Sequence, residues 1–404
     1  MFTRPDWAEV SRHHLLENFR QLRTAAGESA ELMAVLKANA YGHGVLECAP
    51  LLAAAGAGWF GVTCVEEGMR LRAVCPEARI AIMGGMWRGE AEAIIEHRLT
   101  PFVWEPFHLE MLETAVRTRG LAAQSLSVHL EMETGMARQG VPAPATAASE
   151  SPSLEAMLGS FAAPGSSLKL EAVTTHFASA EVLDSDQNER QIARLEAAVE
   201  RVLAHKLHPE WISAGSSATL LAGRPVSTLR TLAAKAGARW MVRPGIALYG
   251  YPPRLSGDTQ AEAVSRTIQE SFRPVLAWKT RVNSLRTIEA GETAGYNATF
   301  VAKRRTRLAL LPIGYADGVN RLLSNRGSVL VRGKRATIAG RVSMDQTILD
   351  VTGIDGVEIG DEAVLIGEQG DERITALEIA DMIGTIPYEV LCAITARVPR
   401  IMVD

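Results

Sequence analysis

Several features that would assign this chain to a specialised class of protein are scarce or missing. Only four cysteines occur among 404 residues, and none forms a CxxC pair, so neither a disulfide framework nor a zinc site is expected. The net charge is −4 and the sequence pI is about 6.2, which argues against the basic surface that nucleic acids or anionic membranes require. The composition therefore predicts a globular protein of a reducing compartment, the cytoplasm.

Long apolar runs are also missing. The longest uncharged stretch, residues 49–65, contains Pro50 and three glycines, and it predicts a helix end, a turn and a buried strand instead of a membrane span. The first residues carry Arg4, Asp6 and Glu9, without the apolar segment of a signal peptide. We therefore expect no targeting segment and no membrane partner.

Short apolar segments alternate with amphipathic ones through the first 250 residues. Candidate strands span residues 33–36, 59–63, 80–83, 100–104, 125–130, 170–174, 210–213 and 240–242. Candidate helices between them include residues 65–74, 88–96, 106–117 and 187–204. Eight strand–helix repeats in this length predict an α/β fold, a TIM-like (β/α)₈ barrel over residues 1–255.

The pattern changes after Gly250. Residues 254–271 are polar and indicate a connector. Short β-like segments follow at residues 275–282, 308–312, 328–331, 337–342, 347–351 and 362–366, and one helix is expected at 376–383 with Thr375 as its N-cap. Residues 256–404 are therefore predicted to form a mainly β domain.

Polar residues follow five of the predicted barrel strands. Lys37, His176 and Arg243 end the first, sixth and eighth strands, and Arg138 and Ser216 follow the fifth and seventh. Barrel enzymes carry their chemistry at the carboxyl ends of the strands. Taken singly, each residue also fits a structural role, such as a solvated lysine or a core histidine. Five converging positions favour an active site.

The residue types in this set match one cofactor. A lysine amine can form a Schiff base. The loops after the last two strands, with Gly215, Ser216, Gly245 and Ile246, can present backbone N–H groups to a phosphate, and Arg243 offers a cation to a ring nitrogen. Together these groups describe a site for pyridoxal 5'-phosphate.

Seven motifs carry a family resemblance. They lie at residues 35–44, 129–140, 175–178, 241–250, 311–318, 340–346 and 388–400. On these motifs the chain resembles the alanine racemase family over nearly its full length. The resemblance implies pyridoxal-phosphate-dependent racemisation of L-alanine and D-alanine, with D-alanine supplied for peptidoglycan.

The resemblance also assigns roles to residues. Lys37 would hold the cofactor and, with Tyr296, supply the two catalytic bases. The other cofactor-binding residues would be Tyr41, His176, Ser216, Arg243, Gly245, Ile246 and Tyr388. The substrate-binding residues would be Arg138, Met344 and Tyr315. Tyr296, Met344 and Tyr315 would reach in from a partner subunit, which implies a homodimer with shared active sites.

Physical reasoning supports this division of roles. Racemisation needs a base on one face of Cα and an acid on the other, which Lys37 and Tyr296 can provide. Tyrosine has an ordinary pKa of about 10, and a chain through His176 to Arg243 would lower it. Arginine rarely gives up a proton, so Arg243 would leave the pyridine nitrogen unprotonated and disfavour transamination.

The sequence departs from the family pattern at three positions. Glu131 stands where a carbamylated lysine is common, seven residues before Arg138. It would either orient Arg138 as a ready-made anion or face solvent. Gly215 replaces a common Asn and Ser343 a frequent Cys, which affects the details of the phosphate and substrate contacts.

Competing functions remain open at this point. A broad-specificity or serine racemase of the same fold would share these motifs. Basic amino-acid decarboxylases pair an acidic residue with the pyridine nitrogen, and Arg243 argues against them. A non-enzymatic pyridoxal-phosphate carrier would have the barrel alone.

Overall fold

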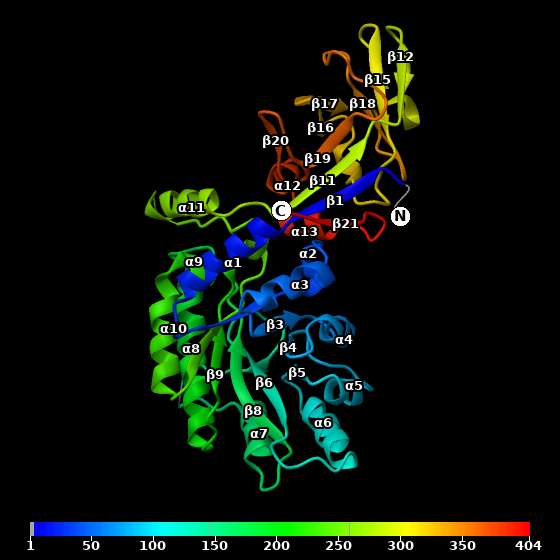
Figure 1. Ribbon diagram of the computed structural model, residues 1–404. Helices are drawn as coiled ribbons and strands as arrows, with labels where there is room; N and C mark the ends of the chain where they lie inside the picture. The colour runs from blue at the N-terminus through cyan, green and yellow to red at the C-terminus, as the bar shows by residue number, and fades with distance from the viewer. Residues whose placement is uncertain (1–3, 147, 258) are drawn as a thin grey trace. The chain divides into compact units, whose positions relative to one another are not determined.

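The computed structural model describes residues 4–146, 148–257 and 259–404 (Figure 1). The chain divides into two compact units. The barrel unit comprises Leu16–Ala38 and Cys48–Phe272. The β unit comprises the chain up to Leu15, Asn39–Glu47 and Arg273–Asp404.

Eight parallel strands form the barrel. In chain order they are β2 (Glu31–Val35), β3 (Trp59–Val62), β4 (Arg79–Ile82), β5 (Leu99–Val103), β6 (Leu126–Glu133), β8 (Leu168–Thr175), β9 (Trp211–Ala214) and β10 (Arg239–Val242). Each strand pairs with its neighbour, and pairing of β10 with β2 closes the ring. A short strand, β7 (Val141–Pro142), adds to β6 outside the ring. The predicted (β/α)₈ barrel is confirmed.

Side chains fill the barrel interior. Met33, Trp59, Phe102, Trp211 and Met241, from five different strands, form one buried cluster together with two alanines. Strands buried on both faces read as apolar runs in the sequence, which is why all eight were found. The barrel is thus a packed core, and its chemistry is confined to the strand ends.

Helices surround the barrel strands. They are α1 (Arg12–Ala26), α3 (Val45–Ala54), α4 (Val65–Val74), α5 (Ala91–Glu96), α6 (Pro106–Thr118), α7 (Pro152–Ala162), α8 (Asp186–Ala204), α9 (Ser217–Ala222), α10 (Arg224–Lys235) and the 3₁₀ helix η1 (Ile246–Tyr249). Among the described residues, no helix combines the length and apolarity needed to cross a membrane.

The β unit contains a ten-stranded sheet. Its strands are β1 (Asp6–Ser11), β11 (Leu276–Arg281), β12 (Ser284–Ile288), β15 (Thr306–Leu311), β16 (Ser328–Val331), β17 (Lys334–Ile338), β18 (Thr347–Asp350), β19 (Glu362–Gln369), β20 (Glu372–Ile374) and β21 (Arg400–Val403). A separate hairpin joins β13 (Thr293–Ala294) to β14 (Phe300–Val301). Figure 1 shows β1, from the start of the chain, beside β11, with which it pairs antiparallel. The predicted mainly β second domain is confirmed.

Two predictions for the second half of the chain were wrong. The expected polar connector contains helix α11 (Thr259–Ser271). Its buried side includes the small residues Ala261 and Ser265, so its mostly polar sequence did not indicate a helix. The expected single helix, α12 (Ala376–Ile383), does have Thr375 as its N-cap, but α13 (Pro387–Cys392) follows it. Pro387 occupies the first turn of α13, where proline is favoured.

Candidate active site

Lys37 lies at the carboxyl end of β2. The N–H of Leu36 donates to the carbonyl of Gly61 on β3 at 2.8 Å. The hydroxyl of the buried Tyr249 donates to the carbonyl of Val35 at 3.0 Å. The backbone that precedes Lys37 is therefore held from both sides, which fixes the start of its side chain.

The turn after Lys37 is left-handed. Helix α2 (Lys37–Tyr41) has φ between 52° and 56° at Ala38, Asn39, Ala40 and Tyr41, a conformation that costs L-residues roughly 1–2 kcal/mol each. The carboxylate of Glu67 accepts the N–H of Ala38 at 2.7 Å and that of Thr63 at 2.8 Å. These hydrogen bonds help to hold the strained backbone in place, and such strained segments cluster at functional sites.

Arg243 is buried inside the barrel. One terminal nitrogen of its guanidinium donates to the carbonyl and hydroxyl oxygens of Ser213, at 2.6 and 2.8 Å, and the other donates to the carbonyl of Thr175 at 2.7 Å. Burial lowers the pKa of Arg243, while the charge of Glu131 raises it. Because arginine stays protonated in proteins, this arrangement provides a fixed cation.

Glu131 is also buried, at 2% exposure, so the solvent-facing alternative is wrong. Its carboxylate accepts a hydrogen bond from the hydroxyl of Thr174. Burial raises its pKa, against the opposing effects of Arg243, Thr174 and Arg138, in that order. Both arginines therefore favour the charged carboxylate, Arg243 more than Arg138, and the expectation that Glu131 orients Arg138 stays a prediction.

His176 follows β8 next to three cations. Burial, followed by the charges of Arg243, Arg138 and Lys37, lowers its pKa to about 3. The imidazole is therefore neutral near neutral pH. Its backbone carbonyl accepts from the side-chain amide of Gln191 at 2.9 Å, which fixes the loop that carries it.

The loops after β9 and β10 are tied together by Ser217. Its hydroxyl accepts the N–H of Gly245 at 3.1 Å and that of Ala247 at 3.4 Å. Gly215 has φ of 105°, and a Cβ there would lie 2.9 Å from the Thr219 side chain. The positive φ and this close contact both favour glycine at position 215. Ser216 precedes α9 as its N-cap residue, and its side chain makes no capping hydrogen bond.

The barrel unit thus brings Lys37, Arg138, His176 and Arg243 together, with Glu131 beside them, and Ser216, Gly245 and Ile246 lie on the joined loops. Arg138 is exposed. Gln191, Ser217 and Glu67 position this site and were not predicted. Gln191 and Glu67 lie in predicted helices that carry many other polar residues, so nothing in the sequence singled them out.

Two further predicted residues lie together in the β unit. The rings of Tyr41 and Tyr388 pack with centroids 5.9 Å apart. A Cβ on Gly42 would lie 2.3 Å from the carbonyl oxygen of Leu391, so only glycine lets the loop of Tyr41 approach α13 this closely. Tyr388, on α13, is therefore held against that loop.

Tyr296, Tyr315 and Met344 lie on adjoining loops of the β unit and are exposed by 67%, 42% and 53%. The N–H of Tyr315 donates to the carbonyl of Ser343 at 3.0 Å. A Cβ on Gly295 would lie 3.0 Å from the backbone nitrogen of Arg341. The three side chains thus form an exposed group on the β unit.

Comparison with known proteins agrees with this geometry. The family models "Alanine racemase, N-terminal domain" and "Alanine racemase, C-terminal domain" match residues 10–253 and 275–402. Alanine racemase of Carboxydothermus hydrogenoformans is 39% identical over 99% of this chain and 100% of that protein. The structure of alanine racemase from Bacillus anthracis with bound L-Ala-P has a TM-score of 0.87 at 29% identity, covering 100% of this chain and 96% of that one.

A further solved structure, alanine racemase from Bartonella henselae with covalently bound pyridoxal phosphate, has a TM-score of 0.79 at 28% identity and covers 99% of both chains. The family models and the curated relative together account for nearly the whole sequence. The chain belongs to the alanine racemase family.

Proposed function

We propose that this protein interconverts L-alanine and D-alanine with pyridoxal 5'-phosphate as its cofactor. The observation that carries the proposal is the placement of Lys37 at the carboxyl end of a barrel strand, with Arg243 and a neutral His176 near it. D-alanine would serve peptidoglycan synthesis. A cytoplasmic location is supported by the low cysteine content, four in 404 residues.

The residues present fit the cofactor. The Lys37 amine would bind it covalently, Arg243 would donate to the ring nitrogen, and His176 would lie beside the ring. Ser216, with the backbone at Gly245 and Ile246, would hold the phosphate, assisted by the hydroxyls of Tyr41 and Tyr388. When bound, the cofactor withdraws electrons from the substrate Cα and so makes its proton removable.

The chain's own groups then move the proton. Lys37 would take or give it on one face of Cα, and the hydroxyl of Tyr296 would do so on the other. Arg138 would bind the substrate carboxylate, and Tyr315 and Met344 would limit the space beyond a methyl group. Arg243, held by backbone carbonyls, would keep the ring nitrogen unprotonated and so limit side reactions.

A homodimer follows from the same proposal. Tyr296, Tyr315 and Met344 are exposed on adjoining loops of the β unit, as expected for side chains that complete the site of a partner subunit. Residues 1–255 would bind the cofactor, and residues 256–404 would contribute to the partner's active site.

Circular dichroism of L-alanine and of D-alanine, each incubated with the holoenzyme, tests the function. Both signals should decay to zero, and neither should decay with Lys37→Ala or Tyr296→Phe. If the signal of serine decays and that of alanine does not, the protein is a racemase of different specificity.

A further inference from the structure

An arginine of the β unit contacts the turn that begins at Lys37. Arg400 is the first residue of β21, and its backbone is fixed in the sheet by parallel pairing with Ala8 of β1. Its side chain is half-buried. Its Nε donates to the carbonyl of Gly42, directly after Tyr41, at 2.8 Å. A side chain with a fixed base thus holds the end of this turn.

The rest of the guanidinium contacts the loop that follows α13. One terminal nitrogen donates to the carbonyls of Thr395 and Val398, at 2.7 and 2.6 Å, and the other donates to the carbonyl of Ile394 at 2.7 Å. Carbonyls from two separate segments therefore converge on one side chain. Because a guanidinium is planar and presents its N–H donors in a fixed fork, it holds both segments in one geometry.

The charge of Arg400 strengthens these contacts. Burial lowers the pKa of Arg400, while the charge of Glu47 raises it, and an arginine stays protonated in proteins. Hydrogen bonds from an ionised donor are stronger than those between neutral groups. A lysine would keep the charge, but its ammonium presents its donors from a single point and cannot reproduce the fork.

The turn is also tied internally by His43. The imidazole is buried, which lowers its pKa to about 4 and keeps it neutral near neutral pH. Its Nδ1 lies 3.0 Å from the carbonyls of both Ala40 and Tyr41. Because both partners are acceptors, the proton is on Nδ1 and the ring donates to them. Holding Gly42 in place therefore also holds Tyr41.

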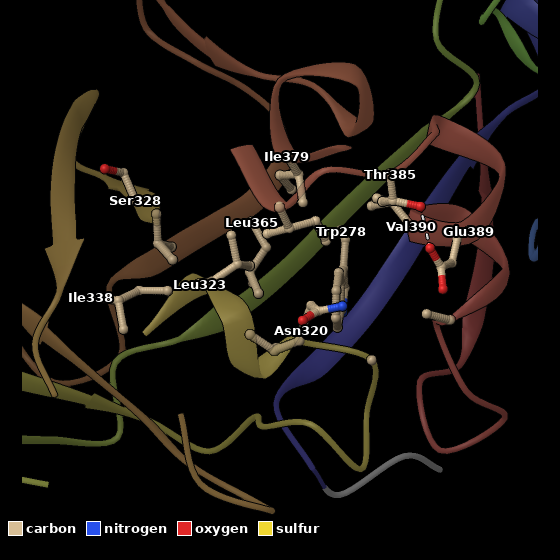
Figure 2. Close-up of a pocket in the computed structure, with 15 residues that line it drawn as sticks. Trp278, Asn320, Leu323, Ser328, Ile338, Leu365, Ile379, Thr385, Glu389 and Val390 are labelled. Carbon is tan, nitrogen blue, oxygen red and sulfur yellow. Dashed lines mark hydrogen bonds between the residues drawn. The ribbon is translucent and has the colours of Figure 1, made fainter. Parts of the chain in front are cut away.

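Helix α13 has its own anchors in the β unit. Val390 is buried and lines a small cavity together with Trp278 of β11 (Figure 2). The carboxylate of Glu389 accepts a hydrogen bond from the hydroxyl of Thr385, just before the helix. Tyr388 lies on the same helix. The segment that carries Tyr388 thus has a fixed position, to which Arg400 can join the turn.

We propose that Arg400 is a positioning residue for the cofactor phosphate: it joins the turn of Tyr41 to the segment after α13 and so keeps the hydroxyls of Tyr41 and Tyr388 at the spacing that one phosphate needs. This inference rests on the proposed function, which assigns both tyrosines to the phosphate. The two rings already pack on each other. The backbone before Lys37 is held by contacts within the barrel unit, so Arg400 should affect the phosphate and not the covalent attachment.

Pyridoxal 5'-phosphate and pyridoxal form a matched pair of probes, because they differ in the phosphate alone and share the aldehyde that reacts with Lys37. Their binding to the full chain freed of cofactor is followed by the change in absorbance, which Lys37→Ala should abolish. We expect Arg400→Lys to raise the Kd of pyridoxal phosphate about tenfold, as for loss of one hydrogen bond to a charged group. The Kd of pyridoxal should stay unchanged. Equal losses for both probes would show a merely structural role and overturn the inference, as would no loss for either.

Arg72 on α4 provides the matched control. Its guanidinium also gathers backbone carbonyls, among them those of Ala78, His97 and Arg98 at 2.6, 2.9 and 2.8 Å. Arg72→Lys makes the same chemical change in the barrel unit and should leave the ratio of the two Kd values unchanged, whatever its effect on the midpoint of urea unfolding. A selective loss of pyridoxal phosphate in this variant would overturn the inference, because the selectivity would then not depend on the turn.

A double-mutant cycle tests whether Arg400 acts through the tyrosines. In a protein that carries Tyr41→Phe and Tyr388→Phe, both hydroxyls are missing. Arg400→Lys should then cause no further rise in the Kd of pyridoxal phosphate. A full tenfold rise in this background would refute the positioning role.

Hydrogen exchange of the unchanged protein provides a test that does not depend on the folding of Arg400→Lys. Exchange of the amides in residues 393–400, followed by mass spectrometry, should slow more with bound pyridoxal phosphate than with bound pyridoxal, because coupling between two sites is reciprocal. Equal exchange with both probes would overturn the inference. Failure of pyridoxal phosphate to bind at all would refute the proposed function, whereas binding without these differences would refute the role of Arg400 alone.

Discussion

The left-handed turn after Lys37 makes a direct prediction about stability. Ala38 has φ of 52° and an exposed side chain, so glycine at this position loses no buried methyl group. Ala38→Gly removes a conformational cost of roughly 1–2 kcal/mol. It adds roughly 0.5–1 kcal/mol of chain entropy lost on folding. The net expectation is a gain of about 0.5–1 kcal/mol in the free energy of unfolding.

A matched substitution gives the comparison. Ala156 is exposed in the middle of the right-handed helix α7, in the same barrel unit. Ala156→Gly should lower the free energy of unfolding by roughly 0.5–1 kcal/mol. The two variants thus make the same chemical change, and the predicted effects have opposite signs.

Urea unfolding of the cofactor-free protein, followed by tryptophan fluorescence, measures both effects as shifts of the midpoint at constant slope. A higher midpoint for Ala38→Gly and a lower one for Ala156→Gly is the expected result. If both midpoints fell by similar amounts, Ala38 would carry no conformational strain, and the contact from Glu67 would not be holding an unfavourable turn.

Three further predictions concern the barrel site. Arg243→Lys should lower the free energy of unfolding by about 1–3 kcal/mol, because one ammonium cannot reach the oxygens of both Ser213 and Thr175 and leaves buried acceptors unpaired. Chemical unfolding measures this change, and an unchanged midpoint would contradict the prediction. Glu131→Gln should lower kcat/KM about tenfold or more, since a hydrogen bond to a charged group contributes roughly 1.5–3 kcal/mol. The matched control, Glu210→Gln on the surface, should leave kcat/KM unchanged. Equal activity of the two variants would show that Glu131 does not contribute to the site. The pKa of His176 is lowered to about 3 from 6.5, so below about pH 6.5 the unfolded state binds a proton that the folded state does not, and the free energy of unfolding falls as the pH drops towards 3. His176→Gln should flatten this dependence of the free energy of unfolding on pH. An unchanged dependence would assign the titration to another group.

The sequence predicted the barrel well because parallel strands are buried on both faces and so stand out as apolar runs. The positions of Lys37, His176 and Arg243 followed from one rule about strand ends. The left-handed turn at Ala38–Tyr41 could not be predicted, since Ala and Tyr disfavour this conformation, Asn39 is the one residue of the four that tolerates it, and a distant carboxylate, Glu67, holds the first N–H.

Other features depended on contacts between distant residues. Glu131 was singled out from the sequence, whereas the charge of Arg243 beside it becomes evident only in the ring that contains β6 and β10. Ser217 and Gln191 join loops that are far apart in the sequence. No pattern within a short window contains that information.

Strand β1 has a consequence for how the protein is made. It lies between β11 and β21 in the sheet, and its residue Ala8 pairs with Trp278 and with Arg400. A ribosome adding roughly 5–20 residues per second reaches β11 some tens of seconds after β1 has emerged. During that interval the barrel segments are synthesised and can begin to fold, while β1 remains an unpaired edge that can associate with other chains. Chaperone demand during synthesis should therefore centre on the first few residues of the chain.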